Sequence, residues 1–503
     1  MLDGVPDRAT NREVVTLPPT SWSPVPGLRD SKLAERVAAA IEADVIKAGW
    51  PVGTLIGSEE QLLARFGVGR GVLHEVARLV EHRQIAKIRR GRNGGLFVAE
   101  PSFAVVNTSL AIYLEYANVE LSDLFEARAV LELFAASYAA STVGDEHVIA
   151  LQGAIDNEVQ QGAKAACRSA YHFHELVAET TDNPALTLFV QALASLTDRP
   201  LRIASAVEKR PEGVGRQIHR DHLEIAAAIA SGDGLLARDY MREHLKILQQ
   251  AITGITTAPS DVDAYDSATS GRRAELIAQR IRRDIVALGW PVGRRLGFEP
   301  ELLERYGVSR AQFREAARIL ESHSVVEMRR GTDGGMVVTA PDGRELMRAC
   351  SLYLRRRGMN RAQLLDVREE LEVATVTLAI EHLTSEGVER LNQIVSREEA
   401  CLDEDFATVG HDLHAAIAEL SGNRALSLLV SILSQLSAER LFPADTTPQQ
   451  SPDAVRSVHR AIAESIIRRD VAQSARLIRK HLRAYTEEGQ QSSPMAPLAM
   501  LSR

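Results

Sequence analysis

Three histidines in the first half of the chain have a spacing that could gather them around one point. His222 and His244 each lie eleven residues from Asp233, inside the turn Ser231–Gly234. Residues equally far from the turn of an antiparallel helical hairpin stand at the same height, so these two imidazoles can face each other. With His174 from another helix they would offer three nitrogens and leave an open position, which is how a divalent metal such as zinc can hold a carboxylate.

The chain carries the same arrangement a second time. His459 and His481 lie eleven residues either side of Asp470, and His414 precedes them as His174 precedes the first pair. The sequence therefore predicts two candidate metal centres of three histidines each. The alternative interpretation is that both sets only form hydrogen bonds within a polar cavity.

An enzyme built on a three-histidine pocket is a further alternative. The sequence shows no Ser-His-Asp arrangement, no HExxH motif and no glycine-rich phosphate loop. It therefore offers no positioned base or nucleophile beside the histidines, and we expect no enzymatic activity.

Helices must position these histidines, and the hydrophobic periodicity predicts them. The pattern is almost continuously helical over residues 103–253 and again over residues 344–488. We expect about six or seven helices in the first stretch. Each stretch is predicted to form an all-α bundle.

A helix-turn-helix pattern precedes the second helical stretch. The amphipathic segments ELLERY and AQFREAARILESH are separated by a GVSR turn, in which the glycine can end one helix and Ser309 can cap the next. Arg310 and Arg314 lie one turn apart at the start of the second segment, the part of a recognition helix that meets base edges in a major groove. The following VVEMRRGTDGGMVV reads as two short strands around a basic tip, which is typical of a wing.

The motif occurs twice, at an offset of 240 residues. Gly49–Gly53 recurs as Gly289–Gly293, and the same offset places Arg70 on Arg310. A period this long indicates a tandem duplication of whole domains. The candidate DNA-contacting residues are Arg70, His74, Arg89, Arg90 and Arg92 in the first copy, and Ser309, Arg310, Arg314, Arg329 and Arg330 in the second. Because the first copy has a histidine where the second has Arg314, we expect the second copy to read DNA more strongly.

These motifs resemble the winged-helix domain of the GntR superfamily, whose signature includes Gly-Val-Ser-Arg followed by Arg-Glu-Ala and Arg-x-Leu-Glu. The helical stretches resemble the FCD ligand-binding domain of its fatty-acid-regulator branch, through Arg128 in LFEARAVLE, Arg368 in LLDVREELE and the histidine spacing. The resemblance implies a mainly α fold, with two winged helix-turn-helix domains each followed by an all-α bundle. It implies a bacterial-type transcriptional regulator with a DNA operator and a small-molecule effector.

The resemblance also implies ligand roles. Family members that bind metal usually add an aspartate one turn before the first histidine, but this chain has Ala170 and Gly410 there, which places a tightly bound zinc or similar divalent ion in doubt. Arg128 and Arg368 would fork onto an effector carboxylate. The alternative for each arginine is a helix-surface pair with the glutamate at i+4.

Charge is distributed in keeping with these roles. The net charge is -8, yet residues 31–100 and 271–341 carry +3 and +4, so the rest of the chain carries -15. Positive charge therefore lies where the motifs predict DNA contact. The sequence shows no transmembrane span or signal peptide, and its three cysteines form no CxxC, so we expect a cytoplasmic protein without a membrane partner.

The predicted domain order follows from these patterns. It is a disordered tail (1–28), a winged helix-turn-helix domain (29–101), a helical domain (102–253), a flexible linker (254–270), a second winged helix-turn-helix domain (271–341), a second helical domain (342–488) and a tail (489–503). The duplication predicts an intramolecular pseudo-dimer, which could associate further as a homo-oligomer. A scaffold whose DNA-binding heads have degenerated is the remaining alternative.

Overall fold

The structure of the chain is a computed structural model. It describes residues 30–91, 94–160, 172–206, 213–255, 262, 273–329, 331, 334–403, 409–438 and 451–484. The two predicted tails and most of the predicted linker lie outside these residues. The chain divides into two compact units, residues 1–106 and 107–503. None of the helices in the described ranges combines the length and the apolar character that a membrane crossing needs.

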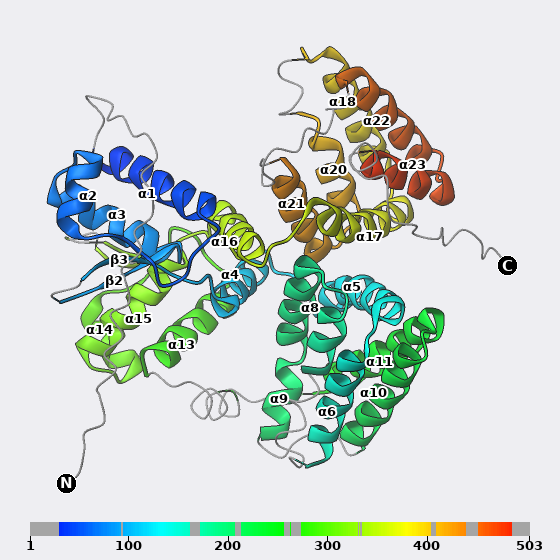
Figure 1. Cartoon of the computed structure of the whole chain (residues 1–503), viewed down its shortest axis with the longest axis horizontal. Helices are drawn as coiled ribbons and strands as arrows, with labels where there is room; N and C mark the ends of the chain where they lie inside the picture. The colour runs from blue at the N-terminus through cyan, green and yellow to red at the C-terminus, as the bar shows by residue number, and fades with distance from the viewer. Residues whose placement is uncertain are drawn as a thin grey trace, which may run out of the picture. The chain divides into compact units, whose positions relative to one another are not determined.

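The described residues of the first unit form three complete helices and a three-stranded sheet (Figure 1). Its elements are α1 (Asp30–Lys47), β1 (Leu55–Gly57), α2 (Glu59–Phe66), α3 (Arg70–His82), β2 (Ala86–Arg89) and β3 (Gly95–Val98). The sheet is antiparallel, with the strand order β1-β3-β2. Helix α3 follows α2 after a short turn, as the helix-turn-helix pattern predicts.

The second unit repeats this plan after the first helical bundle. The elements are α13 (Arg273–Ala287), β4 (Arg295–Gly297), α14 (Glu299–Tyr306), α15 (Arg310–Ser322), β5 (Val326–Arg329) and β6 (Gly335–Val338), and the strand order is β4-β6-β5. The strand register repeats with the sequence offset, since Ala86 pairs with Val98 and Val326 with Val338. The duplication therefore extends to the hydrogen bonding of the strands.

Local residue chemistry explains the turn before α15 and the wing after it. Gly307 has φ 63°, the left-handed conformation that favours glycine, and Ser309 caps α15 by accepting a hydrogen bond from the backbone of Gln312. Gly335 has φ 107°, and a Cβ atom there would lie 2.6 Å from the carbonyl oxygen of Gly297. A larger residue at this position would separate β6 from β4.

The GWPVG turns anchor both sheets. Trp50 and Trp290 are each 6% exposed. The indole Nε1 of Trp50 donates to the carbonyl of Ala99 at 2.8 Å, and that of Trp290 donates to the carbonyl of Thr339 at 2.9 Å. Each tryptophan thus ties the helix before the sheet to the residue that follows its last strand.

The remaining described residues are mostly helical. The first bundle contains α4 (Phe103–Tyr116), α5 (Leu121–Thr142), α6 (Asp145–Gln160), helical residues 172–179, α8 (Pro184–Thr197), α9 (Arg199–Ala206), α10 (Val214–Ala230) and α11 (Gly234–Thr253). The second contains α16 (Gly343–Arg356), α17 (Arg361–Glu381), α18 (Ser385–Ala400), α20 (Asp412–Leu420), α21 (Arg424–Ala438), α22 (Pro452–Ile467) and α23 (Val471–Arg483). Within the described residues, Asp198 between α8 and α9 marks a break that the periodicity does not predict.

Long central helices organise both bundles. Helix α5 packs against α8, α10 and α11, and α17 packs against α20, α21 and α23. The core of the second bundle is formed by aliphatic side chains such as Leu391, Ile462 and Ile478. The hairpins α10–α11 and α22–α23 present one face of each helix to this interior, and that face carries the histidines.

The two bundles meet through reciprocal contacts. Asn183 Nδ2 donates to the backbone carbonyl of Gln363 at 2.7 Å, and Asn423 Nδ2 donates to that of Asp123 at 3.1 Å. Asn423 is the counterpart of Asn183 one repeat later, and Gln363 is the counterpart of Asp123. The two hydrogen bonds are therefore related by a pseudo-two-fold operation. Asn183 also caps α8 through its side-chain oxygen.

Candidate metal centres and nucleic-acid interface

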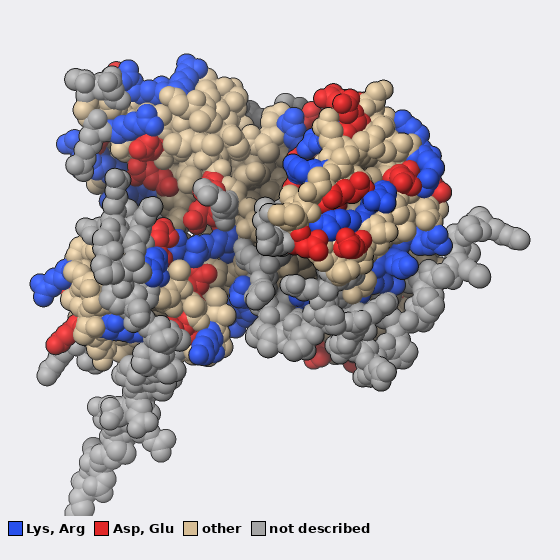
Figure 2. Space-filling model, turned by 90° about the horizontal axis from the view of Figure 1, so that it is seen from above, with Lys and Arg blue, Asp and Glu red and all other residues tan. Residues whose placement is uncertain are grey.

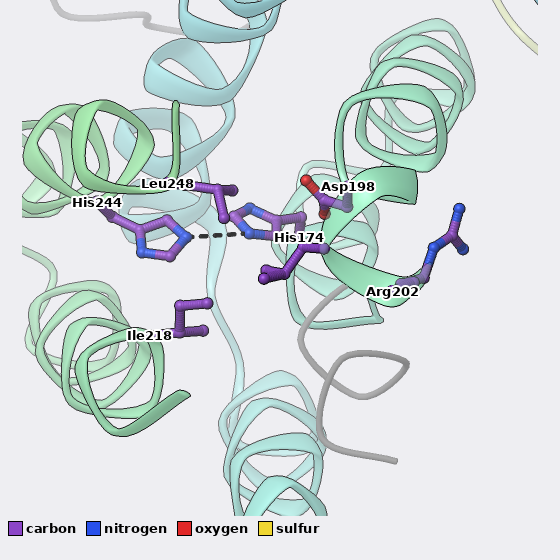
Figure 3. Close-up of a pocket in the computed structure, with 7 residues that line it drawn as sticks. His174, Asp198, Arg202, Ile218, His244 and Leu248 are labelled. Carbon is purple, nitrogen blue, oxygen red and sulfur yellow. Dashed lines mark hydrogen bonds between the residues drawn. The ribbon is translucent and has the colours of Figure 1, made fainter. Parts of the chain in front are cut away.

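The first set of histidines converges inside the first bundle. His222 on α10 and His244 on α11 have ring centroids 4.8 Å apart, as expected for residues equidistant from the hairpin turn. His174 approaches from the helical residues 172–179, with its Nε2 atom 3.3 Å from Nε2 of His244 (Figure 3). All three side chains are buried.

A carboxylate lies at the Nδ1 atom of each of these histidines. Glu158 accepts from His222 Nδ1 at 2.6 Å and Asp221 accepts from His244 Nδ1 at 3.0 Å, whereas Glu132 contacts His174 Nδ1 at 2.5 Å without hydrogen-bond geometry. A carboxylate that accepts the Nδ1–H group leaves the lone pair on Nε2, which is the atom that points into the centre. The carboxylates therefore hold Nε2 of His222 and of His244 toward the centre, which is the orientation that a metal ligand needs.

Burial keeps the imidazoles of this centre neutral. It lowers the pKa of His222 to about 3, and it lowers the pKa values of His174 and His244 as well. The neutral imidazole is the form that binds a metal.

The second bundle repeats the centre with fewer carboxylates. His481 Nε2 lies 3.3 Å from the Nε2 atoms of both His414 and His459. Glu372 accepts from His414 Nδ1 at 2.6 Å, and Glu398 accepts from His459 Nδ1 at 2.9 Å. The third carboxylate has no counterpart, because Val458 stands at the position that corresponds to Asp221.

Both histidine sets fit a divalent metal ion. Two nitrogens bound to zinc at about 2.0–2.1 Å in tetrahedral geometry are roughly 3.3 Å apart, and the measured Nε2 separations are 3.3 Å. The ligand atoms of each set lie within 4.8 Å of one another. Nε2 of His222 is buried and has no hydrogen-bond partner among the described residues. A metal at that atom would satisfy it.

The aspartate that relatives place before the first histidine has no substitute in the second centre. Gly410 has no ligand atom in its side chain, and Ala170 lies outside the described residues. His172 is half-exposed and contacts Glu175 at 3.1 Å, and His411 is not part of the second set. Within the described ranges, each set of ligands therefore consists of three histidines.

Arg128 is buried beside the first centre and is engaged by acidic residues. Its Nε atom donates to Glu132, and its Nη1 atom donates to Asp198 at 2.5 Å and to Thr197 at 2.7 Å. The i+4 pair with Glu132 is thus present, but in the interior and not on a helix surface. Nη2 of Arg128 is buried without a partner among the described residues.

Arg368 has the equivalent place in the second bundle and fewer partners. Its Nε atom donates to Glu372 at 2.5 Å. Nothing in the described ranges accepts a hydrogen bond from its Nη1 or Nη2 atoms. The position that corresponds to Asp198 is Ala438. The two predicted effector arginines therefore lie in different electrostatic surroundings.

A small cavity adjoins the first centre (Figure 3). Its lining includes His174, His244 and Asp198 together with the apolar side chains of Leu201 and Ile218. The cavity volume is about 10 Å³, which is room for about one water molecule.

Reasoning from the sequence did not identify Asp198, Glu158 or Asp221 as site residues. Glu158 and Asp221 are ordinary helix residues in the sequence, and only packing places them beside histidines. Pro200 could have pointed to Asp198, because a proline in the first turn of a helix marks the start of that helix. Here it marks the start of α9, and Asp198 lies between the end of α8 and this start.

The predicted DNA-reading residues of the second copy lie at the exposed N-terminus of α15. Arg310 and Arg314 have side chains 67% and 57% exposed, and both donate to Glu299 Oε1, at 2.8 Å and 3.1 Å. Ser309 caps the helix beneath them. One carboxylate therefore holds the two guanidinium groups together on one face.

The first copy has a weaker version of this face. Arg70 is 81% exposed and lies 3.4 Å from Glu59, and His74 is exposed. Gly69 precedes α3 and forms no side-chain cap. A single arginine thus stands where the second copy has two.

The wings also carry exposed basic residues. The guanidinium of Arg89 lies over the Phe97 ring at 4.3 Å, and Arg90 is exposed. Arg329 pairs with Glu327 at 2.9 Å. Arg92 and Arg330 lie outside the described residues.

On one face of the molecule the described surface mixes charges of both signs. Figure 2 shows acidic and basic side chains interspersed on the face it presents, in keeping with exposed pairs such as Arg460 with Glu399. Interspersed charges give no extended basic field for a phosphate backbone on that face.

Known domain families match most of the chain. The FCD domain matches residues 123–246 and again residues 363–484. The family described as bacterial regulatory proteins, gntR family, matches residues 273–336. The two FCD matches confirm the duplication of the helical bundle, and the GntR match covers the second of the two helix-turn-helix segments.

Individual relatives align with less than half of this chain. The Uxu operon regulator of Haemophilus influenzae is 30% identical over 165 residues, which are 32% of this chain and 58% of that regulator. The Uxu operon transcriptional regulator of Escherichia coli is 26% identical over 223 residues, 43% of this chain and 86% of that regulator. A solved GntR structure from Streptococcus agalactiae aligns with 21% identity and a TM-score of 0.34, covering 42% of this chain and 97% of that one.

Proposed function

This chain belongs to the GntR family of bacterial transcriptional regulators and carries FCD effector-binding domains, and we propose that it recognises an operator through two winged helix-turn-helix heads and responds to a small carboxylate. The observation that carries the proposal is the exposed pair Arg310 and Arg314 at the start of α15, beside a basic wing. Two guanidinium groups on one helical face suit base edges and phosphates of a major groove.

The proposed domain order keeps the sequence-based boundaries. The heads are residues 29–101 and 271–341, and the effector domains are residues 102–253 and 342–488. The matching strand registers support a winged fold for the first head. The two heads present unlike recognition helices, GRGVLHEV and SRAQFREA, so the half-sites of the operator should differ.

The effector domains are proposed to hold a divalent metal at each histidine set. His174, His222 and His244 would bind one ion, and His414, His459 and His481 the other. A bound ion supplies an open coordination position that a carboxylate oxygen can occupy. The protein orients the imidazoles in part through the carboxylates that accept hydrogen bonds from Nδ1 of His222, His244, His414 and His459.

The whole chain is proposed to act as one intramolecular pseudo-dimer. The reciprocal hydrogen bonds of Asn183 to Gln363 and of Asn423 to Asp123 support this, because an isologous dimer makes each contact twice. An effector that prefers one arrangement of the bundles would shift the relative placement of the heads, and so the affinity for the operator.

DNA selection tests this proposal. Fragments of the genome that encodes the protein would be incubated with the full chain, recovered and sequenced, and the selected duplex titrated at several salt concentrations. We expect one chain per duplex, nanomolar binding, and affinity that falls steeply with salt as phosphate counterions are released. Enrichment of no sequence, or affinity that does not change with salt, would contradict operator recognition.

A further inference from the structure

The geometry points to two unlike effector domains: we infer that the second bundle binds a carboxylate between its histidine centre and Arg368, whereas Asp198 occupies the corresponding place in the first bundle. This inference rests on the proposed function, since it assigns the carboxylate response to one of the two sites. It goes further because it names Asp198 and Ala438 as the residues that determine which of the two sites can bind a carboxylate.

In the first bundle a carboxylate of the protein already occupies Arg128. Asp198 accepts from Nη1 of Arg128 at 2.5 Å, and Glu132 accepts from its Nε atom. Arg128 is fully buried between them, so two negative charges face one positive charge. An added carboxylate would meet Asp198 before it could reach the guanidinium.

The size of the cavity also excludes a carboxylate from the first bundle. The cavity beside His174, Asp198 and His244 has a volume of about 10 Å³. That is room for about one water molecule, and a carboxylate is larger. The nearby Arg202 does not open a second route, because its Nη2 atom donates to the carbonyl of Ser195 at 2.6 Å and its side chain extends away from the histidines in Figure 3.

In the second bundle the corresponding arginine retains both of its Nη groups, whereas Arg128 retains only Nη2. Arg368 is 3% exposed and donates from Nε to Glu372, while the described residues leave its two Nη atoms without an acceptor. Ala438 carries no carboxyl group where the first bundle has Asp198. Ser437, the counterpart of Thr197, donates its hydroxyl to the carbonyl of Leu433 at 2.8 Å. A buried guanidinium with two unpaired donor groups is a site for a bidentate carboxylate.

The charges around the two histidine sets also favour carboxylate binding in the second bundle. The first set is accompanied by Glu132, Glu158, Asp198 and Asp221 against Arg128, and the second by Glu372 and Glu398 against Arg368. Both lost carboxylates are replaced by uncharged residues, Ala438 and Val458. The more acidic first centre favours a cation alone, and the less acidic second centre accepts an anion beside its cation.

Arg368 influences the second centre directly. Glu372 accepts from Arg368 Nε at 2.5 Å and from His414 Nδ1 at 2.6 Å, so a single carboxylate joins the guanidinium to the histidine set. A bound carboxylate beside Arg368 would therefore lie next to the candidate metal position. A ligand with a carboxylate and an adjacent polar group would use both contacts.

The test counts carboxylates bound per chain. The full chain, loaded with Co²⁺, would be titrated with acetate, with calorimetry giving stoichiometry and the visible absorption of Co²⁺ reporting on the metal. We expect one acetate per wild-type chain. Ala438→Asp should lower acetate affinity at least tenfold and abolish the spectral change, because the new carboxylate fills the place beside Arg368.

The reciprocal variant is expected to gain a site. Asp198→Ala should raise the stoichiometry to two acetates per chain, and Asp198→Asn, which keeps the shape but removes the charge, serves if the alanine variant does not fold. Two acetates or none bound to the wild type, or an unchanged affinity in Ala438→Asp, would overturn the inference. Metal content and operator binding are measured on the same samples, so failure of the proposed function is seen separately as loss of metal or of DNA binding.

Discussion

The ring of Tyr116 packs edge-on against the indole of Trp290, with ring centroids 5.6 Å apart. Tyr116 ends the helix that leads into the first bundle, whereas Trp290 anchors the second helix-turn-helix segment. Ile112 of the same helix belongs to the core of that segment, and Glu115 pairs with Arg282 at 3.2 Å. Helix α4 of the first repeat therefore completes the core of the second head. The two repeats cannot be separated without exposing that core.

Replacing Tyr116 should destabilise the second head. Tyr116→Ala removes a half-buried aromatic ring and its edge-to-face contact, which should cost about 2–3 kcal/mol. Tyr116→Phe keeps the ring and should cost much less. Thermal unfolding monitored by tryptophan fluorescence checks this. Equal losses for the two variants would show that the hydroxyl group, not the ring, holds the helix in place.

Arg314 should contribute more to DNA binding than His74. Arg314→Ala is expected to cost about 1–3 kcal/mol of binding free energy and to relax preference at one base pair, because a guanidinium can form two hydrogen bonds to a base edge. His74→Ala should cost less, since a neutral imidazole releases no phosphate counterion. Titration of both variants on the selected operator compares them. Equal losses would refute a dominant second head.

Glu299 should affect how strongly the pair Arg310 and Arg314 discriminates between the operator and unrelated DNA. It accepts hydrogen bonds from Arg310 and Arg314, and these bonds lower its pKa, so it is ionised in the free protein. Glu299→Gln should strengthen binding to unrelated DNA several-fold, because one negative charge is removed, and should narrow the ratio between operator and unrelated DNA. Glu304→Gln, on the same helix, is the charge-matched control and should leave that ratio nearly unchanged.

Metal content should follow the histidines one centre at a time. We expect two equivalents in the wild type and one in His481→Ala, measured by elemental analysis of protein purified without chelator. His172→Ala is the control, because His172 is half-exposed and belongs to neither set. A full complement of metal in His481→Ala would remove the second centre from the proposal.

Asp366 should make stability depend on pH. Burial, together with the charge of Glu369, raises its pKa from 3.8 to about 6. The folded state therefore binds this proton more tightly than the unfolded state, so its contribution is full below about pH 4 and is lost as pH rises through 6. Asp366→Asn should stabilise the protein at pH 7.5, by at most about 3 kcal/mol, and should change little at pH 4. Melting curves at the two pH values check this, and stabilisation at pH 4 alone would contradict it.

The sequence by itself determined the features that depend on local spacing. The GVSR turn, the cap at Ser309 and the two strands of the wing follow from glycine conformation and from side chains within a few residues of one another. The pairing of His222 with His244 follows from their equal distance to the turn at Asp233, because a helical hairpin converts equal spacing into equal height. The constant offset of 240 residues between matching motifs also identified the duplication from the sequence alone.

Only the tertiary structure decided what surrounds these residues. His222 meets Glu158, 64 residues away, and Arg128 meets Asp198, 70 residues away, because the packing of separate helices brings them together. Helical periodicity predicts which face of each helix is buried, but not which helix it faces. The two copies therefore have the same pattern of histidine and arginine in the sequence. They differ in their contacts, because Asp198 packs against Arg128 in the first bundle, whereas Ala438 occupies the equivalent position in the second.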